Sequence, residues 1–180
     1  MAYCSLAMNV GCFNDPPERQ GLAHFLEHMI FMGSTKYPEE DAYGSHMAKS
    51  GGYCNAYTEF EWTNFQFQCT YSGLKDSLDM AANNFASPLL KKEAMDREIN
   101  AVESEFKMNL PDDNVRILQI LMNNTFHDDH LFNRFMWGNL QSLKGENPDT
   151  LWDDLKKFYD EHYSADRMKV CIQVKSHDNL

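Results

Sequence analysis

The chain has 180 residues, of which 43% are hydrophobic and 24% are charged, and its formal net charge is −11 at pH 7. This length allows one or two compact units with a sizeable core. The excess of acids and the lack of a basic stripe argue against a nucleic-acid partner, and no run of about eighteen apolar residues predicts a membrane span.

Hydrophobic periodicity and turn residues divide the chain into strands and helices. The expected strands cover 2–12, 53–58, 63–71 and 168–174. The expected helices cover 21–31, 38–50, 73–85, 91–108, 114–124 and 149–163, whereas 125–147 is expected to be rich in loops. Strands that alternate with groups of helices in this order predict an α+β fold with helices packed on a mostly antiparallel sheet.

The first expected helix carries an H-x-x-E-H motif formed by His24, Glu27 and His28. Residues four apart lie on one helical face, so the two imidazoles can bind one metal ion. The alternative is a helix with two surface histidines and an incidental glutamate. Strongly apolar neighbours argue against it, because they indicate a buried helix in which these polar side chains need partners.

A catalytic zinc site usually needs a third protein ligand. One candidate is the loop that holds His127 and His130, although a solvated loop is the preferred interpretation because nothing fixes its geometry. The better candidate is the helix over 91–108. Glu98 and Glu105 lie two turns apart on one face there, which allows one carboxylate to bind metal while the other orients a histidine. A solvated acidic face explains the spacing equally well.

Several segments of the sequence, including the motif itself, resemble the M16 metallopeptidases, or inverzincins, in the branch of insulysin and nardilysin. In that family a glutamate ligand follows the motif after seventy-six residues, and residues 29–104 separate His28 from Glu105 here. The segments that carry the resemblance are 21–34, 36–38, 51–52, 55–56, 97–98 and 100–105. Two further segments, 65–67 and 135–139, lean toward nardilysin-like proteins.

The resemblance implies a single M16 N-terminal catalytic domain over residues 1–180, incomplete at both ends. A chain that opens directly in a strand also indicates a fragment. Family members of this branch are much longer, so the resemblance implies further C-terminal M16 domains as partners. It implies one Zn²⁺ per chain, held by His24, His28 and Glu105, with Glu27 as the general base and Glu98 in support.

The strand over 52–58 resembles the substrate-side edge strand of the family, which implies peptide contacts from Gly52, Asn55, Ala56 and Tyr57. Without the resemblance, an ordinary hairpin strand is the preferred interpretation. The implied function is a zinc-dependent endopeptidase, and the acidic composition agrees with basic peptides as substrates. The alternatives are a catalytically incomplete module that binds peptides or partners, and an H-x-x-E-H lyase, which would need a cysteine ligand in a matching context.

The five cysteines form no C-x-x-C pair, and an odd number argues against a disulfide scaffold. This usage fits a reducing compartment, so a cytoplasmic location is expected, with secretion or an organelle not excluded. A second copy of the chain, forming a homo-oligomer, is a further partner hypothesis.

Overall fold

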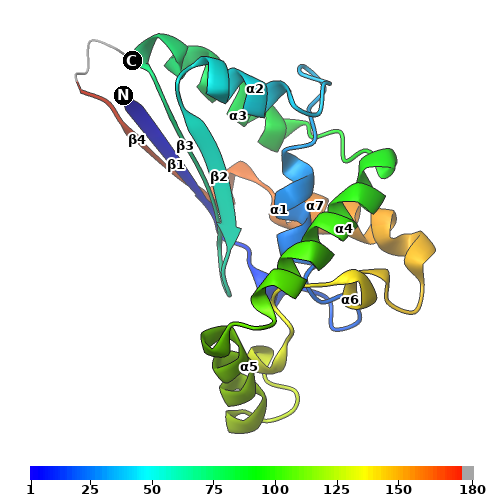
Figure 1. Cartoon of the computed structure of the whole chain (residues 1–180). Helices are drawn as coiled ribbons and strands as arrows, with labels where there is room; N and C mark the ends of the chain where they lie inside the picture. The colour runs from blue at the N-terminus through cyan, green and yellow to red at the C-terminus, as the bar shows by residue number, and fades with distance from the viewer. Residues whose placement is uncertain (176–180) are drawn as a thin grey trace.

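The computed structural model describes residues 1–175 and contains a four-stranded sheet covered by helices (Figure 1). The strands are β1 (Ala2–Met8), β2 (Tyr53–Thr58), β3 (Thr63–Cys69) and β4 (Met168–Gln173). Their order is β2-β3-β1-β4, and every neighbouring pair is antiparallel. The predicted α+β fold with an antiparallel sheet is confirmed, and β2 and β4 form the two edges.

The helices lie on one side of the sheet, and α5 extends away from the others (Figure 1). Their bounds are α1 (Leu22–Ile30), α2 (Ala42–Lys49), α3 (Leu74–Ala86), α4 (Lys92–Asn109), α5 (Asp113–Thr125), α6 (Leu140–Lys144) and α7 (Leu151–His162). Among residues 1–175, no helix is both long enough and apolar enough to cross a bilayer.

The first expected strand was too long, whereas the region 125–147 is rich in loops as expected. The first strand ends at Met8 rather than near residue 12, because the backbone turns there and Cys12–Asn14 form a 3-10 turn. The region 125–147 contains the short helix α6. Asn139 caps it by accepting a hydrogen bond from the Ser142 amide, and Glu103 of α4 accepts another from the Leu140 amide. Five residues are too short to show helical periodicity, so only these caps mark it.

The core lies between the sheet and α1. The β1 and β3 side chains that face the helices alternate with polar ones on the opposite face, as a half-covered sheet requires. On α1 the side chains that are at most 1% exposed are Leu22, Ala23, Phe25, Leu26, Met29 and Ile30. This helix is therefore held between β2, α4 and α7, and its few polar residues point into one cleft.

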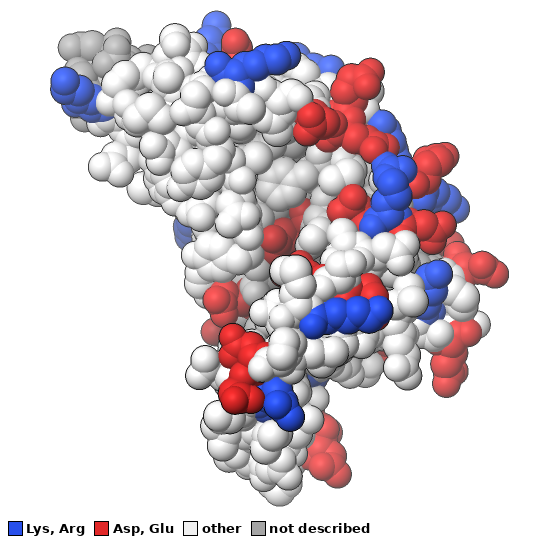
Figure 2. Space-filling view, in the orientation of Figure 1, with Lys and Arg blue, Asp and Glu red and all other residues white. Residues whose placement is uncertain are grey.

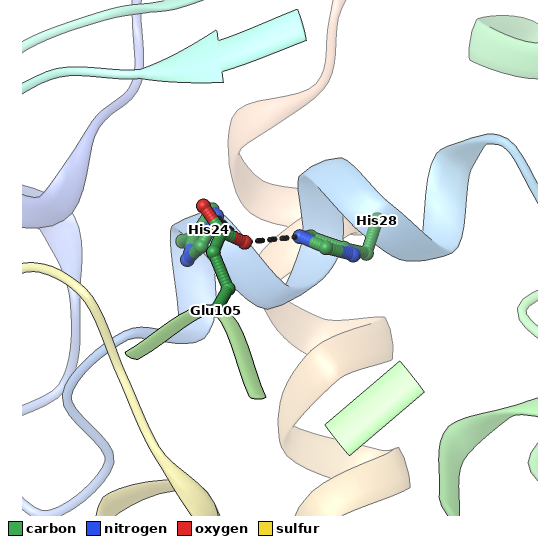
Figure 3. A group of neighbouring side chains, drawn as sticks. All are labelled: His24, His28 and Glu105. Atoms are coloured by element: carbon green, nitrogen blue, oxygen red, sulfur yellow. Dashed lines mark ion pairs between the residues drawn. The ribbon is translucent and has the colours of Figure 1, made fainter. Parts of the chain in front are cut away.

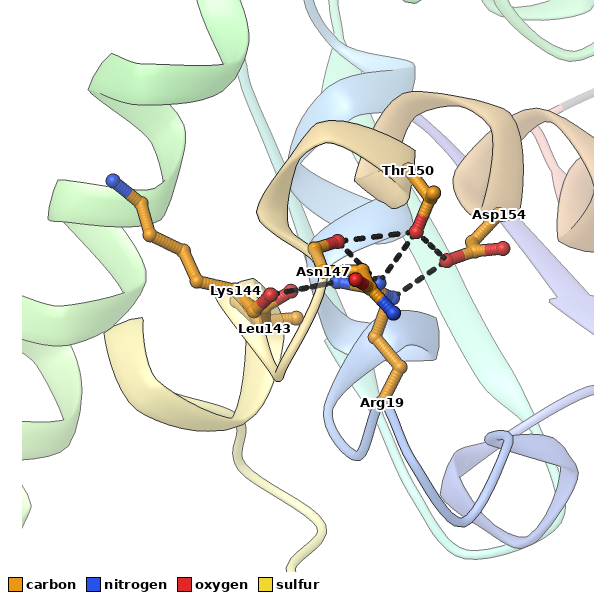
Figure 4. Close-up of polar contacts among 6 residues, drawn as sticks. All are labelled: Arg19, Leu143, Lys144, Asn147, Thr150 and Asp154. Carbon is orange, nitrogen blue, oxygen red and sulfur yellow. Dashed lines mark hydrogen bonds and ion pairs between the residues drawn. The ribbon is translucent and has the colours of Figure 1, made fainter.

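Arg19 connects the loop before α1 to the segment between α6 and α7 (Figure 4). Its guanidinium donates to the carbonyls of Leu143 and Asn147, and its Nε lies 2.7 Å from Asp154 Oδ2. The side chain is only 4% exposed. A buried cation with several acceptors fixes the relative positions of elements that are distant in the sequence.

Candidate metal centre

The first turn of α1 is capped from outside the helix. Gly21 precedes the helix with φ +92° and has no side chain that can cap it. Asp15 takes that role: its Oδ2 accepts a hydrogen bond from the Gly21 amide at 2.7 Å and its Oδ1 accepts one from the Ala23 amide at 2.8 Å. These bonds satisfy amides that the helix itself leaves free. They fix the backbone immediately before His24.

The structure brings His24, His28 and Glu105 together (Figure 3). His24 and His28 lie one turn apart on α1, and Glu105 reaches them from α4. Glu105 Oε2 is 3.6 Å from His24 Nε2 and 3.5 Å from His28 Nε2. One ligand atom from each residue lies within 4.8 Å of the other two, and no other such set occurs among the described residues.

The donor set fits a zinc ion in spacing, and His24 fits it in protonation as well. Ligand atoms bound to a tetrahedral zinc at about 2.1 Å lie about 3.4 Å apart, close to the observed 3.5 and 3.6 Å. The Trp137 carbonyl oxygen lies 2.6 Å from His24 Nδ1. A carbonyl only accepts, so Nδ1 carries the hydrogen and Nε2 keeps its lone pair for a metal.

Glu98 contacts the His28 ring at the nitrogen that faces away from Glu105. Its Oε2 is 3.4 Å from His28 Nδ1, while Glu105 faces the opposite nitrogen. Burial lowers the pKa of His28, but the contacts with Glu105 and Glu98 outweigh it and raise that pKa to about 9. Burial lowers the pKa of His24, and the contact with His28 lowers the pKa of Glu105. The site thus combines imidazole nitrogens with a negative potential that favours a cation.

Glu27 lies beside the histidines and is 7% exposed. Thr58, the last residue of β2, donates a hydrogen bond of 2.6 Å from its hydroxyl to Glu27 Oε2. Burial raises the pKa of Glu27 to about 7, although the Thr58 bond acts in the other direction. Edge strand β2 therefore meets the motif helix at the carboxylate expected to act as base.

A cleft of about 550 Å³ contains this group, a size typical of ligand sites. Its walls include Asn55, Ala56 and Tyr57 from β2, so three of the four residues expected to contact substrate line it. Gly52 does not line the cleft in this structure. A Cβ on Gly52 would lie 1.7 Å from the Gln68 carbonyl oxygen, so the residue permits close packing of β2 on β3.

The alternative histidine pair does not form a ligand cluster. His130 stacks on Phe126 and Phe132, and its Nδ1 accepts a hydrogen bond from the Phe132 amide. His127 belongs to no metal-binding set among residues 1–175. The sequence interpretation of this region as an ordinary loop agrees with these contacts.

Three contributors to the site were not identified from the sequence. Asp15 acts through hydrogen bonds from amides six and eight residues later, Thr58 acts through one to a residue 31 positions earlier, and the Trp137 contribution is a backbone carbonyl. The aspartate does stand in a turn before the motif helix, which is a signal for a cap. Neither of the others has a spacing signal.

Two imidazoles on one helix and a carboxylate on another form the kind of ligand set that catalytic zinc domains use. Comparison with protein families identifies the particular family: the model described as Insulinase (Peptidase family M16) matches residues 1–137. The chain therefore belongs to peptidase family M16.

Individual relatives agree. The chain is 46% identical over 173 residues to a nardilysin-like protein of Arabidopsis thaliana and 44% identical over 173 residues to the A-factor-processing enzyme of Saccharomyces cerevisiae. Each match covers 95% of this chain and 17% of the relative. Human nardilysin is 41% identical, with 95% and 15% covered. The chain thus spans less than a fifth of the length of these relatives.

A solved structure gives the same result. The crystal structure of pitrilysin superposes with a TM-score of 0.93 and 35% sequence identity, covering 99% of this chain and 19% of that one. The predicted resemblance to the M16 family and to its insulysin and nardilysin branch is confirmed.

Proposed function

We propose that this chain carries the zinc site of an endopeptidase. The observation that supports it most is the convergence of His24, His28 and Glu105 within 4.8 Å, with the buried Glu27 beside them. Membership of a peptidase family supports the reaction class. The proposed stoichiometry is one Zn²⁺ per chain, bound through both imidazole Nε2 atoms and the Glu105 carboxylate.

A zinc ion in such a site lowers the pKa of a bound water to about 7 and polarises a carbonyl. In the proposed mechanism Glu27 accepts the proton of the attacking water and delivers it to the leaving amine. Thr58 holds one Glu27 oxygen with its hydroxyl, which leaves the other oxygen for the proton. Glu98 supports the site by fixing the orientation of the His28 ring.

The proposed substrate is a peptide in extended conformation. Because β2 is an edge strand that lines the cleft, a peptide can add to it as a further strand through backbone hydrogen bonds. Asn55, Ala56 and Tyr57 of this strand line the cleft, and we propose that the Asn55 side chain donates to a peptide carbonyl. Gly52 contributes by letting β2 pack closely on β3.

A preference for basic peptides is part of the proposal. The cleft walls include Glu40, Asp41 and Glu98 in addition to the central glutamates. Figure 2 shows acidic side chains inside the hollow near the centre of this face. The net charge of −11 adds a long-range attraction for cations.

The relatives are more than five times as long, so we propose that residues 1–180 form an N-terminal catalytic domain that works with further M16 domains. Those domains would complete the walls of the cleft. We also propose a cytoplasmic location, which rests on the cysteine usage; one of the relatives is named as peroxisomal.

The test is metal analysis and peptide cleavage by the wild-type chain, the Glu27→Gln variant and the Glu61→Gln variant. Glu61 is exposed and serves as the matched control. We expect one zinc per chain in all three and loss of cleavage only in Glu27→Gln. Absence of zinc in the wild type would overturn the metal site. Zinc without cleavage by the wild type would mean that this chain is a catalytically incomplete fragment, which needs the further M16 domains to complete its cleft.

A further inference from the structure

The segment 134–139 lies directly against the start of the motif helix. Gly21 and Gly138 both have positive φ angles, +92° and +78°. A Cβ on Gly21 would lie 2.1 Å from Gly138 Cα, and a Cβ on Gly138 would lie 2.9 Å from Gly21 Cα. The two backbones therefore touch, and no other residue type fits at either position without a shift.

Three hydrogen bonds from two residues anchor this segment to the loop before α1. Arg134 Nη1 donates to the Phe13 carbonyl at 2.7 Å and to the Asp15 carbonyl at 2.5 Å. The Phe135 amide donates to Gln20 Oε1 at 2.6 Å. The segment is thus fixed immediately before Trp137 and Gly138, at the point where it meets α1.

This anchoring places one backbone carbonyl at His24. The Trp137 oxygen lies 2.6 Å from His24 Nδ1, and His24 Nε2 points toward Glu105 at 3.6 Å. A backbone carbonyl in a fixed segment has no rotamer through which it can move away. His28 differs, since its Nδ1 faces the flexible side chain of Glu98.

We propose that segment 134–139 is a positioning element for the metal, in which the Trp137 carbonyl selects the Nδ1–H tautomer of His24 and Gly138 permits the contact. This inference rests on the proposed zinc site. The carbonyl holds the ring plane and leaves Nε2 as the free donor, the tautomer that binds zinc on the side of Glu105. Trp137 and Gly138 act through His24 and are positioning residues.

The test compares Gly138→Ala with Gly145→Ala. Gly145 also has a positive φ, +52°, but its added Cβ would meet the Glu18 carbonyl at 3.3 Å, away from His24. The first readout is ¹⁵N NMR of labelled histidine in the metal-free protein, which reports the His24 tautomer. The second is zinc affinity, measured by competition with a chromophoric chelator.

The wild type and Gly145→Ala should show a single Nδ1–H tautomer for His24 and equal zinc affinity. Gly138→Ala should show mixed tautomers and bind zinc about 10- to 100-fold more weakly, as loss of an orienting partner usually does. Unchanged tautomer and affinity in folded Gly138→Ala would overturn the proposal. An Nε2–H tautomer of His24 in the wild type would also overturn it, and that measurement needs no variant.

Failure of this inference and failure of the proposed function give different results. A wild type that binds no zinc contradicts the zinc site, whichever tautomer His24 has. A wild type that binds zinc, with Gly138→Ala binding equally well, contradicts only the positioning role. If Gly138→Ala does not fold, Gln20→Ala removes the acceptor of the Phe135 amide and should weaken zinc binding by a smaller factor; unchanged affinity there counts against the inference.

Discussion

Replacing Arg19 by Met tests how the structure holds the loop before α1 against the segment between α6 and α7 (Figure 4). Met keeps most of the buried volume and removes the charge and the donors. The change leaves the Leu143 and Asn147 carbonyls without this donor. It also removes the ion pair in which Arg19 Nε lies 2.7 Å from Asp154 Oδ2. Leaving two carbonyls without their charged donor costs about 2–4 kcal/mol, while Asp154, whose side chain is 37% exposed, can be hydrated.

For a chain of this size each kcal/mol lowers Tm by about 2–4 °C, so Arg19→Met should lower it by roughly 10 °C. Urea unfolding should show a lower midpoint with an unchanged m-value. The matched control is Arg116→Met, since Arg116 is 63% exposed and pairs with Asp113 on the same helix. Exposed pairs are worth about 0–1 kcal/mol. Equal, small losses in both variants would refute the buried network as a source of stability.

Three further predictions concern the cleft and its surroundings. Thr58→Val removes a hydrogen bond to the Glu27 carboxylate, which is worth about 1.5–3 kcal/mol, and should lower kcat at least about tenfold with zinc content unchanged. Burial raises the pKa of Asp15 from 3.8 to about 7. Between pH 3.8 and pH 7 the folded protein therefore keeps a proton on Asp15 that the unfolded protein has lost. The free energy of unfolding should fall by up to about 1.4 kcal/mol per pH unit as the pH rises through this range. Gly44→Ala in α2 should stabilise by about 0.5–1 kcal/mol, whereas Gly52→Ala should destabilise by more than about 2 kcal/mol.

A different result would contradict each of these predictions. A Thr58→Val variant with wild-type kcat would mean that the hydroxyl does not orient Glu27. The stability that protonated Asp15 contributes is complete below its pKa in the unfolded chain and is lost as the pH rises through its pKa in the folded chain. Asp15→Asn should flatten this part of the plot of unfolding free energy against pH. An unchanged slope in Asp15→Asn would mean that other groups cause the pH dependence. Equal stability of the two glycine variants would contradict the close approach of β2 to β3 at Gly52, because the Gly44 Cβ would meet only the Asp41 side chain.

The motif helix could be predicted from sequence because its apolar face and polar trio have a clear helical period. The choice of Glu105 could not be made from spacing alone, since Glu98 lies on the same face. The structure shows that both acids contact His28, on opposite nitrogens. Glu103 lies two residues before Glu105 on the same helix, and it instead accepts a hydrogen bond from the first amide of α6.

What could not be predicted depends on contacts between distant parts of the chain. The Thr58 hydroxyl and the Trp137 carbonyl join the site from positions 31 and 113 residues away from their partners in the chain. Helix α6 depends on Glu103 from α4, 37 residues earlier. Such contacts leave no periodic pattern, whereas the alternation of β3 does, and β3 was placed to within two residues.

The most direct measurement is the zinc content of the wild-type chain and of Glu105→Ala after dialysis against equal free zinc. Glu105 supplies the oxygen that lies 3.5 and 3.6 Å from the two histidine nitrogens, so it should complete the site. The wild type should retain one zinc per chain and Glu105→Ala should retain far less, while Glu93→Ala, at an exposed position of the same helix, should match the wild type in zinc content. Zinc bound undiminished by Glu105→Ala, or none bound by the wild type, would contradict the metal site.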